Sequence, residues 1–84
     1  MQEFVKMLKE KLPRDNIHTG MVISIARDRK LEDKVKVLEY LQNQENECRE
    51  WLAKNKNAAM NSKRRDYSRK LEEIQSMKQL LEKI

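Results

Sequence analysis

The residue types that carry out enzymatic chemistry are scarce and scattered in this sequence. His18 is the sole histidine, Cys48 the sole cysteine and Gly20 the sole glycine. A nucleophilic triad or a multi-histidine zinc site needs several such residues in one place, and a phosphate-binding loop needs several glycines. We therefore expect no enzyme, no metal site and no other cofactor. His18 is interpreted as an ordinary loop residue.

Two pairs of acidic residues are the remaining candidates for acid–base chemistry. Glu32 is followed by Asp33, and Glu72 is followed by Glu73. Side chains that are neighbours in sequence do not face each other on a helix. We interpret both pairs as solvated faces of helices.

The strongest charge signal is a group of basic residues in one part of the chain. The net charge is +5, but residues 49–70 contain eight basic and two acidic side chains, a local net charge of +6. Such asymmetry favours an anionic partner. We call these eight side chains the basic end. They are Arg49, Lys54, Lys56, Lys63, Arg64, Arg65, Arg69 and Lys70.

The basic end has three possible interpretations. Lys and Arg could neutralise the phosphates of a nucleic acid, although the positions are spread around a helix and no aromatic residue is interleaved to stack on bases. The chain has no zinc-finger or RNA-recognition signature. The segment 12–20 is too long to be the turn of a helix-turn-helix motif. An acidic protein surface and no partner at all are the other interpretations.

Long helices must carry these charges. Charged residues make up 39% of the chain, with one Gly and one Pro, a composition typical of long helices and coiled coils. If residues 31–84 fold back near Asn57 so that the numbers of paired residues add to 115, the apolar residues meet in layers. This register pairs Leu31 with Ile84, Leu38 with Met77, Leu41 with Ile74, Cys48 with Tyr67 and Glu45 with Lys70.

Two residues of this predicted seam are not simple hydrophobic residues. Glu45 opposite Lys70 either specifies the register or extends to water. Cys48 is interpreted as a small buried hydrophobic residue in a reducing compartment.

We predict a single domain, residues 1–84, with three helices. Residues 1–12 form an N-terminal helix that Pro13 ends, and residues 13–20 connect it to the next, with Asp15, Asn16 and Thr19 as candidate caps. Residues 21–56 form the second helix, with a kink at 27–30 left open, and residues 58–83 form the third. Residues 21–26 would also suit a short strand, but no partner strand is visible.

The second helix has a broad apolar surface. Val37, Tyr40 and Trp51 adjoin the seam, and a helix apolar over so wide an arc normally packs against two neighbours. A second copy of the chain or the N-terminal helix would cover these residues. The two aromatic residues are either core or anchors for a partner.

The sequence thus predicts an all-α fold, a long antiparallel helical hairpin resembling a coiled coil, with a short N-terminal helix packed across it. The expected function is a non-enzymatic protein–protein interaction module, a small adaptor or regulator that self-associates as a dimer. The alternative is a nucleic-acid-binding accessory protein that uses the basic end. No signal peptide is visible, and no run approaches the roughly 18 apolar residues of a membrane span, so we expect a cytoplasmic protein.

Overall fold

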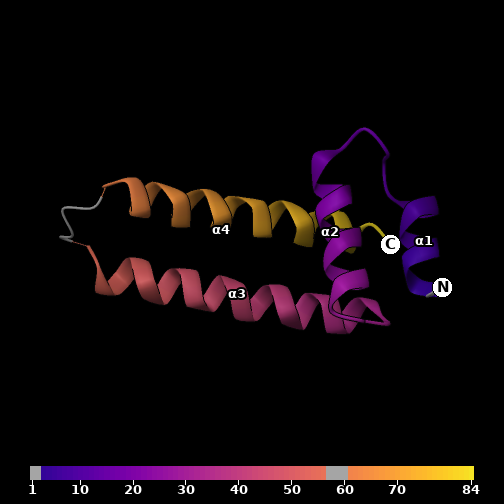
Figure 1. Cartoon of the computed structure of the whole chain (residues 1–84), viewed down its shortest axis with the longest axis horizontal. Coiled ribbons are helices and arrows are strands. Elements are labelled where there is room, and N and C mark those ends of the chain that lie inside the picture. Colours follow the sequence, from indigo (N-terminus) through magenta and orange to yellow (C-terminus); the bar gives the residue numbers. More distant parts are fainter. Residues whose placement is uncertain (1–2, 57–60) are drawn as a thin grey trace.

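The structure is a computed structural model and describes residues 3–56 and 61–84. The described part is helical and contains no strand, which confirms the all-α class. Two long helices form an antiparallel hairpin, and two shorter helices lie at the end opposite its turn (Figure 1). The helices are α1 (Glu3–Lys11), α2 (Ile17–Asp28), α3 (Lys34–Lys54) and α4 (Asn61–Glu82).

Local capping signals explain where the helices begin and end. The side chain of Asn16 accepts a hydrogen bond of 2.9 Å from the backbone N–H of His18 and starts α2. Asp33 starts α3 in the same way, because its carboxylate accepts from the N–H of Lys36 at 2.9 Å. Such side chains satisfy donors that have no partner within the helix. Pro13 follows the end of α1, as predicted.

The described residues form four helices in place of the predicted three, because the expected helix 21–56 is interrupted. Lys30 adopts a left-handed conformation with φ of 54°. The N–H of Leu31 donates a hydrogen bond to the carbonyl of Ala26, and the N–H of Lys30 donates one to the carbonyl of Arg27. This pair of bonds is the Schellman motif that ends helices, here with a lysine where glycine is usual. The stop was hard to predict for that reason.

Helix α2 also begins earlier than expected, since Ile17–Gly20 belong to it rather than to the connection. Residues 21–26 are helical and not a strand. The predicted turn at Asn57 and the predicted helix start at residue 58 lie outside the described residues.

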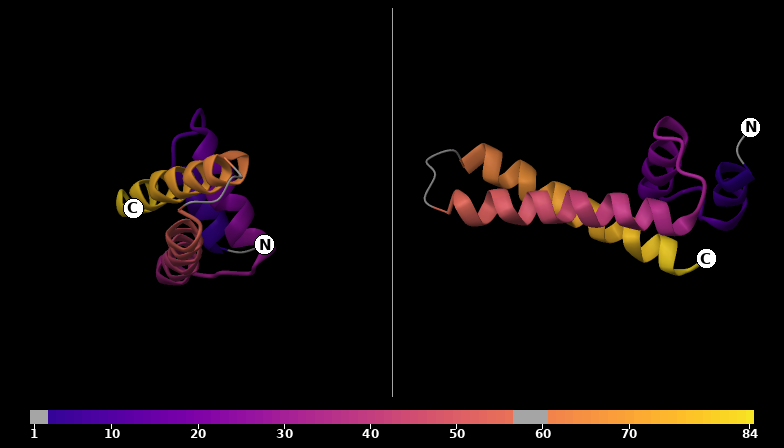
Figure 2. Two further views of the ribbon diagram at one scale, coloured as in Figure 1. Left: turned by 90° about the vertical axis from the view of Figure 1, so that its left-hand side faces the viewer. Right: turned by 90° about the horizontal axis from the view of Figure 1, so that it is seen from below.

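Helix α2, not the N-terminal helix, lies across the base of the hairpin. It packs against both α4 and α3, and α1 packs against α2 (Figures 1 and 2). The molecule is therefore elongated, measuring 45 × 24 × 20 Å. The predicted placement of the N-terminal helix directly across the hairpin is wrong, because the interruption at Lys30 frees α2 to take that position.

The hydrophobic core lies mainly where α2 meets the hairpin. Leu8, Val22, Val37, Leu41 and Leu81 are fully buried there and come from all four helices. Cys48 is also buried, further along the hairpin, and is a free cysteine, as interpreted from the sequence.

The hairpin register differs from the predicted one by about one helical turn. Trp51 stacks on Tyr67, and Gln42 accepts a hydrogen bond from Lys78. The residue numbers of these pairs add to 118 and 120, three and five more than 115, an average shift of about one helical turn. A shift of three or four residues returns nearly the same helix face. The apolar pattern therefore could not distinguish the two registers.

Some predicted neighbours are still close in the observed register. Leu41 and Ile74 line the same small cavity, together with Met77. Leu31 is outside α3, and it is Lys34 whose ammonium group donates to the carbonyl oxygen of Ile84 at 2.7 Å.

Candidate binding site at the basic end

The structure places most of the basic end towards the turn end of the hairpin (Figure 1), whereas Lys70 lies further along α4 and lines a hollow together with Met21 and Ile25 of α2. The members of the basic end come from the C-terminal part of α3, from the residues just after it and from the first half of α4. The antiparallel fold thus brings together side chains that are up to 21 residues apart in the sequence.

Three of the eight basic side chains have partners within the protein. Arg49 forms an ion pair with Glu45 at 3.3 Å, and Lys54 forms one with Glu50 at 2.7 Å. The guanidinium of Arg64 donates to the carbonyl oxygen of Asn55 at 2.6 Å. It also donates to the carbonyl of Leu52 at 3.5 Å, so it ties α4 to the end of α3.

The other five basic side chains are exposed. They form no salt bridge with any residue in 3–56 or 61–84. They are Lys56, Lys63, Arg65, Arg69 and Lys70. These five charges are the ones available to a partner.

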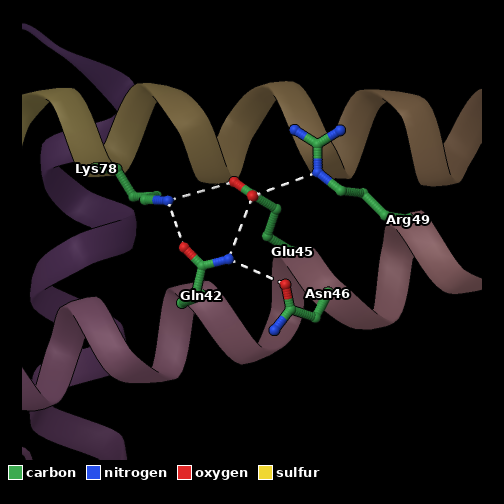
Figure 3. Close-up of polar contacts among 5 residues, drawn as sticks. All are labelled: Gln42, Glu45, Asn46, Arg49 and Lys78. Carbon is green, nitrogen blue, oxygen red and sulfur yellow. Dashed lines mark hydrogen bonds and ion pairs between the residues drawn. The ribbon is translucent and has the colours of Figure 1, made fainter.

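The predicted pair of Glu45 and Lys70 is wrong. Glu45 is buried, 9% exposed, and its carboxylate accepts hydrogen bonds from Gln42 and Arg49 of α3 and from Lys78 of α4 (Figure 3). The Lys78 ammonium group is 3.4 Å from the carboxylate. Glu45 thus does join the two helices, but through a lysine about two helical turns beyond the predicted one.

The environment of Glu45 also changes its acidity. Burial alone would raise its pKa, but the hydrogen bond from Arg49 and the charge of Lys78 outweigh burial, so the pKa lies below its ordinary value. The carboxylate is therefore ionised at neutral pH.

An aromatic pair lies beside the basic end. The rings of Trp51 and Tyr67 are stacked, with centroids 4.3 Å apart and planes 8° from parallel. The predicted register does not contain this pair, because it places Tyr67 opposite Cys48 and Trp51 on an adjoining face. Both aromatic residues are half-buried.

The residues predicted for self-association have different environments. Val37 is fully buried within the protomer, Tyr40 lies under the guanidinium of Arg29 at 4.4 Å, and Trp51 stacks on Tyr67. Intramolecular contacts cover Val37, so a second copy is not needed there. Self-association stays a prediction, with only Tyr40 and Trp51 keeping partly exposed surface.

Two hollows lie along the hairpin and share Lys70. One, of about 140 Å³, is formed where α2 meets α3 and α4. The other, of about 210 Å³, lies beside Tyr67 and is lined by Asp66 and Lys70. The first hollow is lined by Met21, Ile25, Tyr40, Leu41, Gln44, Lys70, Glu73, Ile74 and Met77.

Sequence spacing could have identified some of these contacts but not others. Glu45 with Arg49, and Glu50 with Lys54, follow the four-residue spacing of helical ion pairs. Lys78 is 33 residues from Glu45, and no spacing rule connects them.

The described residues contain no group of three or more His, Cys, Asp or Glu side chains that could hold a metal ion. Within the same residues, no helix combines the length and the apolar character needed to cross a membrane.

Comparison of the chain with protein-family models, with curated proteins and with solved structures finds no match in any of the three.

Proposed function

We propose that this chain is a non-enzymatic helical interaction module of the cytoplasm that binds the acidic surface of a protein partner through its basic end. One observation carries the proposal. Five side chains of the basic end are exposed, and none forms a salt bridge with a described residue. Uncompensated charge of one sign attracts an opposite charge and accelerates association.

The start of α4 supports the same proposal. Its first turn contains no acidic residue but includes Lys63 and Arg64. Positive charge at a helix N-terminus opposes the helix dipole and costs about 0.3–1 kcal/mol per charge. Residues that are unfavourable for local structure are expected mainly at functional sites. An anionic partner would offset the unfavourable positive charge at the start of α4.

The test reverses three exposed charges and leaves Arg64 in place, because Arg64 holds the two helices together. The variant Lys63→Glu/Arg65→Glu/Arg69→Glu changes the charge of the basic end by six units. A matched control, Lys6→Glu/Lys11→Glu/Lys36→Glu, makes the same change at exposed positions of α1 and the start of α3. Poly-L-glutamate serves as the acidic polypeptide, and binding is measured between about 50 and 200 mM salt.

We expect the parent to bind poly-L-glutamate, with affinity that falls as salt rises. The variant at the basic end should bind at least about tenfold more weakly, a loss of roughly 1.4 kcal/mol, whereas the control should change much less. Equal losses of affinity in both variants would show that binding depends on the net charge of the protein and not on a site at the basic end. Binding that ignores salt in the parent would contradict the proposal.

A nucleic acid is the second candidate, favoured by the same five exposed cations, two of which are arginines one helical turn apart, Arg65 and Arg69. In this case oligo-dT should bind more tightly than poly-L-glutamate, and the logarithm of affinity should fall linearly with the logarithm of salt concentration. Sedimentation of the parent at micromolar concentration tests the expected dimer separately.

A further inference from the structure

We infer that a hollow formed by α1, α2 and their connection binds a small molecule that carries a phosphate monoester. These helices lie at the end of the molecule opposite the hairpin turn (Figure 1), so the inference goes beyond the proposed function and does not depend on the basic end. It depends on three observations: two unpaired cations, a buried hydroxyl group without a partner, and a helical glycine that the fold itself does not need.

Three segments of the chain line this hollow of about 310 Å³. Lys9 comes from α1, Arg14 from the connection after it, and Thr19, Gly20 and Ile23 from the first two turns of α2. The volume lies at the lower end of the range of small-molecule sites, roughly 300–1,000 Å³. The size therefore suits a compact ligand.

The charge of the hollow is positive and uncompensated. Lys9 and Arg14 are exposed, and neither forms a salt bridge with a residue in 3–56 or 61–84. Among the same residues, no acidic side chain lines the hollow. The first turn of α2 contains no acidic residue and adds the partial positive charge of a helix N-terminus. Two cations match a phosphate monoester, whose charge is about −1.5 to −2 at neutral pH, better than they match a single carboxylate.

Thr19 supplies a buried polar group that lacks a partner. The residue is 6% exposed, and its hydroxyl oxygen has no hydrogen-bond partner among the described residues. An unpaired buried hydroxyl group is unfavourable, and such groups are few in native proteins. Threonine in a helix adopts two side-chain conformations that place the hydroxyl group in different positions. Rotation between them would let this hydroxyl group, which protein atoms cover in the structure, donate to a phosphate oxygen in the hollow.

Gly20 is the sole glycine of the chain and lies within a helix, where glycine is less favourable than alanine. Its backbone does not require glycine, because its φ is not positive. Packing does not require glycine either, since a Cβ atom at this position would meet no other atom within 4 Å. The missing side chain instead keeps one wall of the hollow open and lets a ligand approach the backbone of α2 closely.

Ile23 favours an ester over inorganic phosphate. It is half-buried and supplies apolar surface to the hollow, one helical turn after Thr19. An apolar group of the ligand that lies against Ile23 is removed from water, which is favourable. Inorganic phosphate has no such group, so the ester should bind more tightly.

The experiment titrates the full chain with phenyl phosphate, inorganic phosphate or benzyl alcohol and follows backbone amide signals by NMR. Labelling with isotope-enriched glycine gives a single amide signal, because Gly20 is the sole glycine. Uniform labelling provides the amide signal of Ile23 for variants that lack the glycine.

We expect phenyl phosphate to shift the Gly20 signal saturably and to bind at least about threefold more tightly than inorganic phosphate. Benzyl alcohol, which has no charge, should not shift the signal at the same concentrations. Lys9→Gln/Arg14→Gln should weaken binding of phenyl phosphate by at least about tenfold. The matched control Lys11→Gln/Lys36→Gln removes the same charge at exposed positions outside the hollow and should weaken binding by less than about twofold.

Two further variants separate a binding role from a structural one. Gly20→Ala should raise the melting temperature by about 2–8 °C, because alanine favours the helix. Thr19→Val should also raise it, because valine leaves no unpaired hydroxyl group. Both variants should nevertheless bind phenyl phosphate at least about threefold more weakly, an effect that a gain in stability does not explain.

Several results would overturn the inference. They are a Gly20 signal that phenyl phosphate does not shift, equal weakening in the two double variants, and unchanged binding by both Gly20→Ala and Thr19→Val. Inorganic phosphate that binds as tightly as phenyl phosphate would overturn the ester as the ligand. Binding of poly-L-glutamate at the basic end is a separate measurement, so the proposed function stands or falls independently.

Discussion

Glu45 shows what a single buried charge contributes to this hairpin. Its carboxylate accepts hydrogen bonds from three side chains on two helices (Figure 3). Glu45→Gln should lower the free energy of unfolding at neutral pH by about 1–3 kcal/mol, the usual range for a hydrogen bond to a charged group. Urea denaturation measures the change, and Glu47→Gln, an exposed neighbour, is the control.

The effect of Glu45 should depend on pH in a defined direction. Because its pKa is lowered in the folded state, the unfolded chain binds the proton more readily. The stabilisation is therefore complete above the ordinary pKa of 4.5 and is lost as pH falls through the lowered value. The stability difference between parent and Glu45→Gln should shrink on acidification. A difference that grows instead would mean that burial, not pairing, dominates this site.

At the scale of single helices, capping residues decide where each element starts. Asp33 accepts a hydrogen bond from the N–H of Lys36 and begins α3. Asp33→Ala should cost about 1 kcal/mol of unfolding free energy. Glu32→Ala, at the preceding exposed position, removes a similar charge without removing the cap and should change stability by no more than about 0.5 kcal/mol. Equal effects of the two substitutions would assign the loss to charge alone.

Arg64 joins two elements, in contrast to its basic neighbours. It donates hydrogen bonds to carbonyl groups at the end of α3, where such groups have no partner within the helix. Arg64→Ala should lower the melting temperature, with a loss of about 1–3 kcal/mol. Arg65→Ala should leave the melting temperature nearly unchanged and should instead weaken binding to poly-L-glutamate. If Arg64→Ala melts at the same temperature as the parent, the hydrogen bonds of Arg64 to the end of α3 do not stabilise the fold.

The whole molecule has two regions of unequal packing. All four helices contribute to the core near α2, whereas at the turn end the described residues of α3 and α4 have only each other. Regions with few buried apolar contacts open at lower free energy. Amide hydrogen exchange should therefore be slowest near Val37 and Leu41 and fastest in the first turns of α4. Uniform protection would show that the hairpin opens as one unit.

Exchange can also reveal binding at the turn end. Poly-L-glutamate bound to the basic end should slow exchange near Tyr67 and Lys70, while amides near Val37 change little. This pattern would connect the less stable part of the hairpin with its proposed role.

The sequence alone determined the fold class, the presence of a hairpin and the position of the basic end. Composition and the spacing of apolar residues are enough for this, because one stripe at helical spacing must be buried against another. The burial of Cys48 and the helical nature of residues 21–26 followed from the same pattern.

Only the tertiary structure decided the register, the number of helices and which basic residues are free. Registers one turn apart bury nearly the same apolar side chains, so the choice depended on specific contacts, such as Trp51 with Tyr67 and Glu45 with Lys78. Helix α2 ends where Lys30 adopts a left-handed conformation. This position is usually a glycine, so the sequence contains no residue that marks the helix end. Arg64 and Lys70 look alike in the sequence; the packing of α3 against α4 makes one a structural cap and leaves the other facing two hollows.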